Sequence, residues 1–131
     1  MTGVADTRLL LALEFPPDED AKKRLEHLAT KEISGRLLAP SIILTEFIKI
    51  AGARIGADAA KVRIQFLKEK GMRIVSLDEE IAMVAGRLLL SHRDVPVADS
   101  LIASFIQTGV AEYVVSDDPH FRTLGIRTKW I

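Results

Sequence analysis

Hydrophobic residues along the chain fall into two repeating patterns, which predict alternating strands and helices. Short apolar runs that end in polar or turn residues are typical of buried strands, and apolar residues spaced three or four apart indicate helices. The expected strands are Gly3–Thr7, Met72–Leu77, Tyr113–Ser116 and Ile126–Trp130, together with a strand that begins at Leu37 and gives way to a helix at Pro40-Ser41. This alternation predicts an α/β domain with a largely parallel sheet, in which Trp130 is exposed on an edge strand.

The same spacing predicts which side of each helix faces the core. The helix that follows Gly56 is expected to bury four apolar residues: Ala59, Val62, Phe66 and Leu67. The helix before Gly56 is apolar almost all round, with Leu44, Phe47 and Ile48 among its residues. Because such a helix is either fully buried or part of a subunit interface, its outer side is expected to form a homodimer contact.

The composition is that of one globular domain over residues 1–131. Hydrophobic residues make up 48% of the chain and charged residues 27%, and the mean hydropathy is +0.18. The longest apolar run, Leu9–Leu13, is far shorter than the roughly 20 residues that a membrane span requires. The first residues lack the pattern of a secretion signal, and the chain has no cysteine. A cytoplasmic protein that does not insert into a membrane is therefore expected.

Acidic residues occupy positions in the pattern that invite a chemical explanation. Asp99 stands at the start of an apolar helix, and Glu46 interrupts the apolar face of another. Asp6 and the pair Asp117-Asp118 each follow a predicted strand. Each has a sufficient local role as a helix-dipole residue, a helix cap, a surface glutamate or a turn residue. Only a shared site would explain all of them together.

A parallel sheet would bring some of these acids to one edge, because binding sites gather at the carboxyl ends of its strands. Two carboxylates about 4 Å apart repel by about 4 kcal/mol at an effective dielectric constant near 20, so such a cluster needs protons or cations. Carboxylate oxygens suit Mg²⁺ or Mn²⁺. The 18 basic and 18 acidic residues balance, so the net charge gives no sign of a nucleic-acid partner. Binding of RNA would require a local basic surface near the acidic pocket, which the net charge of the whole chain does not reveal.

Four segments in order resemble the acidic motifs of PIN domains: Ala5–Thr7, Pro40–Glu46, Val97–Ala103 and Val115–Phe121. The resemblance covers nearly the whole chain. It implies a PIN-like α/β/α sandwich with a small, mostly parallel central sheet and a ribonuclease site that depends on Mg²⁺ or Mn²⁺. It also implies a frequent homodimer, and many small members are VapC-type toxins paired with a VapB-like antitoxin.

The resemblance further implies four residues that hold the metal and orient the attacking water: Asp6, Glu46, Asp99 and Asp118. Thr7 and Ser116 would support them through hydroxyl hydrogen bonds. The family's last acid usually stands two residues after a Thr or Ser, which favours Asp118, with Asp117 as a plausible substitute ligand. His120 lies within the same motif and is interpreted as a surface residue.

Other functions compete with a ribonuclease toxin. The chain could be a catalytically inactive PIN-like module whose acidic pocket accepts a basic segment of a partner, or an RNA-processing nuclease without an antitoxin. A phosphoacceptor receiver domain would need its acidic pair after the first strand, and the chain has it near the last. A haloacid-dehalogenase-type phosphatase would need a second Asp two residues beyond Asp6, where Arg8 stands.

Overall fold

The computed structural model describes residues 1–131 as alternating strands and helices. The strands are β1 (Gly3–Ala5), β2 (Leu37–Pro40), β3 (Arg73–Val75), β4 (Tyr113–Val115) and β5 (Thr128–Lys129). The helices are α1 (Thr7–Glu14), α2 (Glu19–Gly35), α3 (Ser41–Ile55), α4 (Ala57–Lys70), α5 (Glu79–Ser91), α6 (Val97–Gln107) and α7 (Pro119–Thr123). No helix combines the length and the apolar character that crossing a membrane would require.

The strands form one parallel sheet in the order β3-β2-β1-β4-β5. Gly3 pairs in register with Leu37 on one side and with Tyr113 on the other. The chain builds outward from β1 to β3 and then returns to place β4 on the opposite side of β1. The carboxyl ends of β1 and β4 therefore flank the point where the strand order reverses, which is the usual place for a site in such sheets.

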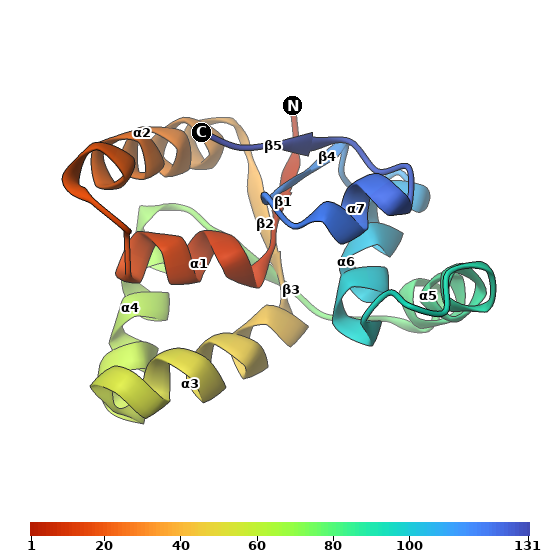
Figure 1. Ribbon diagram of the computed structural model, residues 1–131, viewed down its shortest axis with the longest axis horizontal. Helices are drawn as coiled ribbons and strands as arrows, with labels where there is room; N and C mark the ends of the chain where they lie inside the picture. Colours follow the sequence, from red (N-terminus) through yellow and green to blue (C-terminus); the bar gives the residue numbers. More distant parts are fainter.

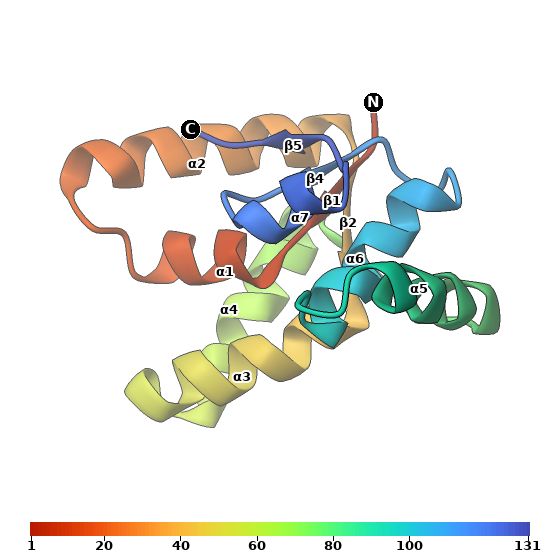
Figure 2. The same cartoon turned by 45° about the vertical axis from the view of Figure 1, so that its right-hand side comes forward.

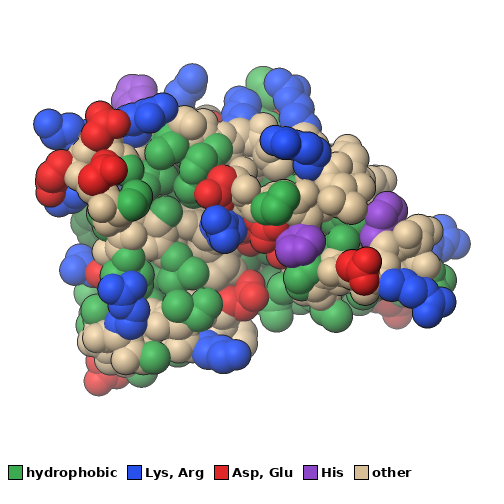
Figure 3. All heavy atoms as spheres, in the orientation of Figure 1, with side chains coloured by type: hydrophobic (Ala, Val, Ile, Leu, Met, Phe, Trp, Pro, Cys, Tyr) green, Lys and Arg blue, Asp and Glu red, His purple; other side chains and the backbone are tan.

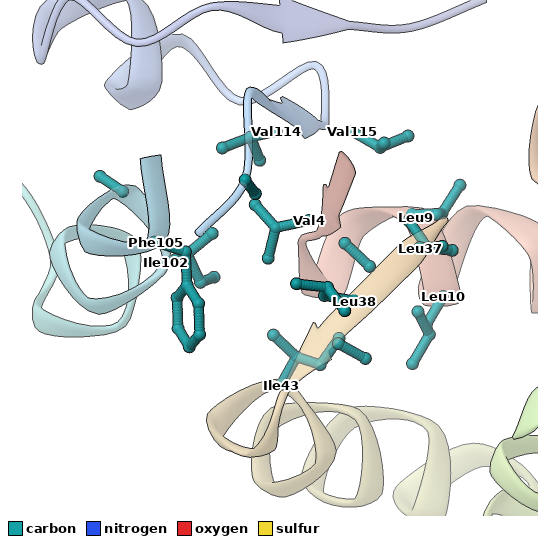
Figure 4. Close-up of a cluster of buried hydrophobic side chains, with 14 of the residues drawn as sticks. Val4, Leu9, Leu10, Leu37, Leu38, Ile43, Ile102, Phe105, Val114 and Val115 are labelled. Atoms are coloured by element: carbon teal, nitrogen blue, oxygen red, sulfur yellow. The ribbon is translucent and has the colours of Figure 1, made fainter. Parts of the chain in front are cut away.

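Helices cover both faces of the sheet, which confirms the expected α/β sandwich (Figures 1 and 2). In both views α1, α2 and α4 lie on one side, and α5 and α6 lie on the other. Figure 4 shows Val4 of β1 between Ile102 and Phe105 of α6 and, on the other side, Leu38 of β2 and Leu10 of α1. All residues of β1, β2 and β4 are buried, because both faces of these central strands are covered.

Helix α4 is turned relative to its predicted orientation. It buries Ala60 and Ile64, whereas Val62 is 64% exposed and Phe66 is 52% exposed. Two neighbouring apolar stripes run along this helix, and packing against α3 selects the stripe with the small residue, so that Ala60 is fully buried. The prediction that Ala59, Val62 and Phe66 face the core is wrong.

Phe47 of α3 is only 2% exposed and belongs to the core of its own chain, so it does not contribute to the outer side of that helix. Two other expectations need correction. Trp130 packs partly against the core, although it was expected to be exposed. The edge strands are also shorter than predicted, because β3 and β5 have a neighbour on one side only.

A buried polar contact joins the amino end of the sheet to α2. The hydroxyl of Tyr113 donates a short hydrogen bond to Oε1 of Glu32. Glu32 is only 4% exposed. Gly3 leaves room for this pair, since a Cβ atom there would lie 2.7 Å from the Tyr113 ring. The ammonium group of Lys129 lies 4.0 Å from the centre of the same ring. Burial and the acceptor Glu32 raise the pKa of Tyr113, so the phenol stays protonated as the donor.

We predict that Tyr113→Phe lowers the free energy of unfolding by about 1–3 kcal/mol, because it leaves a buried carboxylate of Glu32 without its donor. Glu32→Gln should cost less, since its amide oxygen can still accept the hydrogen bond. Urea denaturation of both variants measures the difference. Equal stability of Tyr113→Phe and the wild type would show that this contact does not stabilise the fold.

Candidate functional site

Asp6 lies where β1 becomes α1, at the carboxyl edge of the sheet. It is 2% exposed and caps α1, with Oδ1 accepting from the backbone N–H of Thr7 at 2.8 Å. Its Oδ2 accepts from the hydroxyl of Ser116 at 2.7 Å. Because Ser116 follows β4, this hydrogen bond ties together the carboxyl ends of the two neighbouring strands β1 and β4.

The segment after β4 directs its two acids in different directions. The Ser116 hydroxyl accepts from the backbone N–H of Asp118 at 3.0 Å, and Asp118 caps α7 by accepting from the N–H of His120 at 2.9 Å. Asp117 instead forms an ion pair with Arg8, in which Nη2 donates to Oδ2 at 3.1 Å. Arg8 lowers the pKa of Asp117 through this contact. Asp118 therefore faces the other acids, whereas Asp117 is directed to a cation.

Asp99 and His120 lie next to Asp118, but one side-chain atom of each is left without a hydrogen bond. Nδ1 of His120 lies 3.1 Å from Oδ2 of Asp99 and 2.7 Å from Oδ1 of Asp118. Neither Oδ2 of Asp99 nor Nδ1 of His120 is exposed to water or aligned for a hydrogen bond. Buried polar atoms are rarely left in this state without a ligand or water that completes them. These two atoms point to an external partner at this position.

Glu46 reaches the same edge from the second turn of α3. Its Oε1 accepts a hydrogen bond of 2.6 Å from the hydroxyl of Thr7. Its second oxygen makes no hydrogen bond within the chain. The two predicted supporting hydroxyls therefore act on different acids, since Thr7 donates to Glu46 and Ser116 donates to Asp6.

Burial and the charges of neighbouring acids raise the pKa values of Asp6 and Asp99. Burial raises the pKa of Asp6 to about 6, helped by the charges of Asp118 and Glu46 and opposed by the hydrogen bonds from Ser116 and Thr7. Burial also raises the pKa of Asp99 well above its usual range, with the charges of Asp118 and Asp6 adding to the shift. A cation bound here would relieve both penalties at neutral pH.

Asp99, Asp118 and His120 form a group that could bind a metal, since each offers one ligand atom and these atoms lie within 4.8 Å of one another. Asp6 is close enough for its charge to raise the pKa of Asp99. Figure 3 shows acidic and histidine side chains side by side near the middle of the face, between α1 and α7. A set of carboxylate oxygens and an imidazole nitrogen suits a divalent cation such as Mn²⁺ or Mg²⁺.

His120 is the residue of this group that sequence reasoning missed. Its side chain is 40% exposed, in keeping with the expected surface position, but its Nδ1 atom is buried between Asp99 and Asp118. The available signal was its position two residues after Asp118, next to a proline that begins a helical turn. Such a turn directs residues 118 and 120 toward a common space.

We predict that, without divalent ions, the wild type loses stability relative to Asp99→Asn as the pH rises. The folded chain binds protons more tightly than the unfolded chain when carboxyl pKa values are raised, so ionisation between the ordinary value of 3.8 and the raised values costs stability. At pH 8, Asp99→Asn should be more stable by on the order of 1–2 kcal/mol, and at pH 4 this advantage should disappear.

Urea denaturation in EDTA at the two pH values measures this difference, with the exposed Asp94→Asn as the matched control. An Asp99→Asn chain that is no more stable than the wild type at pH 8 would contradict the repulsion that we infer.

Residues 4–126 match the family of the PIN domain. No protein with a curated description matches the sequence. Solved structures share the fold across nearly their whole length. One is VapBC2 from Rickettsia felis bound to a DNA fragment from its promoter, with a TM-score of 0.74, 16% identity and coverage of 99% of this chain and 98% of that one.

Another is VapC20 from Mycobacterium tuberculosis, described as a toxin that cleaves the sarcin-ricin loop, with a TM-score of 0.75, 15% identity and 96% of each chain covered. A toxin-antitoxin complex from Klebsiella pneumoniae gives a TM-score of 0.64 at 16% identity and covers 89% of this chain and 87% of that one. At such identities the likeness concerns the fold. The match of the sequence itself, over almost the whole chain, shows that this protein belongs to the PIN domain family, a family of nucleases.

Proposed function

We propose that the chain is a metal-dependent endoribonuclease that cleaves RNA phosphodiester bonds with water, and that it acts as the toxin of a toxin-antitoxin pair. The observation that carries the proposal is the group of Asp99, Asp118 and His120, in which two buried polar atoms lack hydrogen bonds. A structural N-cap or dipole role explains each acid separately but leaves these atoms unexplained.

We assign the metal to Asp6, Asp99, Asp118 and His120, with Mg²⁺ or Mn²⁺ as the ion. Oxygen ligands suit both ions, and the imidazole nitrogen is more favourable for Mn²⁺. When bound, such a cation supplies positive charge that activates water and stabilises the developing charge on the phosphate. Asp117 has no part in this assignment, because its carboxylate binds Arg8.

Glu46 is the residue that we assign to the attacking water. The Thr7 hydroxyl fixes one of its oxygens at 2.6 Å, which leaves the second oxygen to orient water or accept its proton. Ser116 donates a hydrogen bond to Asp6 and accepts one from the backbone N–H of Asp118. These two contacts fix the loop that carries Asp118 relative to Asp6. The hydroxyl groups thus position carboxylates and need not touch the substrate.

An antitoxin partner fits a second feature of the surface. A groove of about 700 Å³ runs between α1, α2 and α4. Two of its lining residues form an ion pair, in which Nε of Arg63 on α4 lies 3.1 Å from Oε2 of Glu14 on α1. The exposed ring of Phe66 lies on its wall. The lining carries basic and acidic groups in equal number: Lys22, Arg63, Lys70, Glu14, Glu19 and Glu26. Such a neutral, partly apolar lining favours a peptide segment of a protein partner over a polyanion.

The homodimer remains a proposal that rests on the outer side of α3. Ile50 is 45% exposed there, while Leu44 and Ile48 are partly buried. Sedimentation of the purified chain distinguishes a dimer from a monomer.

We predict that Mn²⁺ raises the Tm of the wild type at pH 8 and does not raise that of Asp118→Asn. At a metal concentration a hundredfold above Kd, linkage contributes about 2.7 kcal/mol, which is on the order of 10 °C for a chain of this size. Asp117→Asn is the matched control and should keep the increase, because its carboxylate faces Arg8. Loss of the increase in both variants, or in neither, would contradict the ligand assignment.

We also expect Asp99→Asn to reduce RNA cleavage in Mg²⁺ or Mn²⁺ by at least about 100-fold. Cleavage of a labelled RNA by wild type and variant, measured on gels, tests this expectation. Equal cleavage would remove Asp99 from the mechanism. If the wild type neither cleaves RNA nor responds to Mn²⁺, yet binds an arginine-rich peptide, the chain is an inactive binding module.

For the partner, we predict that Phe66→Asp abolishes co-purification with the product of the neighbouring reading frame, because it places a charge on the apolar wall of the groove. The exposed Met83→Asp on α5 is the control for a charge placed outside the groove. RNA cleavage by Phe66→Asp should equal that of the wild type. Retained binding would exclude the groove as the antitoxin site.

A further inference from the structure

A smaller pocket beside the acidic group combines arginines with aromatic rings. Its volume is about 280 Å³, and its walls come from α1, α3, the loop after β4 and the segment that carries Trp130. Arg8, Phe15, Arg54 and Trp130 line it together with Asp117. Figure 3 shows hydrophobic and basic side chains over α1 and α3, beside the acidic centre of the same face.

Two residues that line the pocket are chain neighbours of residues at the candidate metal site. Arg8 follows Thr7 directly in the chain, and Asp117 directly precedes Asp118. The ion pair of Arg8 and Asp117 therefore lies between the pocket and the acidic group. A polymer with one unit at the acidic group would reach the pocket by crossing this ion pair.

Arg54 carries the pocket's uncompensated positive charge. Its guanidinium lies 3.8 Å from the centre of the Phe15 ring, and it makes no ion pair with any carboxylate. Stacking on Phe15 fixes the plane of the guanidinium, so its N–H groups are arranged in advance for an anion. A phosphate matches this fork geometry and can receive two parallel hydrogen bonds.

Trp130 supplies a flat apolar surface in the same pocket. It is the only tryptophan of the chain, and it is partly buried against the core, so its indole is held in place. Indole rings stack on nucleobases of any sequence, and aromatic rings next to arginines are typical of single-strand binding surfaces. A base and a phosphate together would match Trp130 and Arg54, whereas an acidic peptide would leave the indole without a matched partner.

We propose that this pocket binds the nucleotide next to the cleaved position of a single-stranded RNA, with Arg54 on its phosphate and Trp130 stacked on its base. The inference rests on the proposed ribonuclease function and adds the place where the substrate strand is held. The cation that would meet the phosphate is a single local arginine, which is compatible with a chain whose net charge is zero.

Binding of a fluorescein-labelled single-stranded RNA to the Asp99→Asn chain in Mg²⁺ tests the proposal by fluorescence anisotropy. Adding Arg54→Ala or Trp130→Ala should weaken binding about tenfold each. Arg54→Ala should also reduce the slope of log affinity against log salt by about 0.7. The exposed Arg87→Ala on α5 is the matched control and should bind as the parent does. Trp130→Phe should restore most of the affinity, which separates stacking from a folding defect.

The single tryptophan gives a second readout. Unlabelled RNA should quench Trp130 fluorescence, and a polyglutamate peptide at the same charge concentration should not. If the wild type cleaves RNA while Arg54→Ala and Trp130→Ala bind it as Arg87→Ala does, the pocket proposal is overturned and the ribonuclease function stands. If the wild type neither binds nor cleaves RNA, both proposals fail. Quenching by polyglutamate instead of RNA would assign the pocket to an acidic peptide.

Discussion

Repulsion among carboxylates in a partly dry space is the constraint on which this structure depends. Asp6, Asp99 and Asp118 come from three different parts of the chain, and the fold holds them together although burial and like charge raise the pKa values of Asp6 and Asp99. The favourable contacts nearby are few: hydrogen bonds from the hydroxyls of Ser116 and Thr7 and from backbone N–H groups at two helix starts. Burial of the hydrophobic core on both sides of β1 and β4 must therefore offset the unfavourable free energy of holding these acids together.

The two edges of the sheet solve the problem of buried acids differently. At the amino edge, Glu32 has a protonated partner in Tyr113 and needs no ion. At the carboxyl edge, Asp99 has a neighbouring histidine that approaches it without forming an aligned hydrogen bond. A satisfied acid can be purely structural, whereas an unsatisfied one retains its capacity to bind something else. This contrast within one molecule distinguishes a carboxyl edge that retains unpaired buried polar atoms from an amino edge that does not.

The parallel sheet and the positions of Asp6 and Asp118 after strands were predictable, because strand pattern and strand order place those residues at one edge. The orientation of α4 was not, since the stripe of Val62 and Phe66 and the stripe of Ala60 and Ile64 have equal periodicity. The approach of His120 to Asp99 depends on how α7 packs against α6, which no local pattern encodes. Trp130 is similar, because its burial depends on elements far earlier in the chain.

The hydrogen bond between Ser116 and Asp6 joins residues that are 110 positions apart. Contacts of such long range form late, since most of the loop between them must first become ordered. A chain that has folded only as far as α6 possesses Asp6, Glu46 and Asp99 but not the loop that completes the group. A chain that lacks this last segment therefore lacks the assembled acidic group, and the ribonuclease activity that we propose would be confined to molecules that have finished folding.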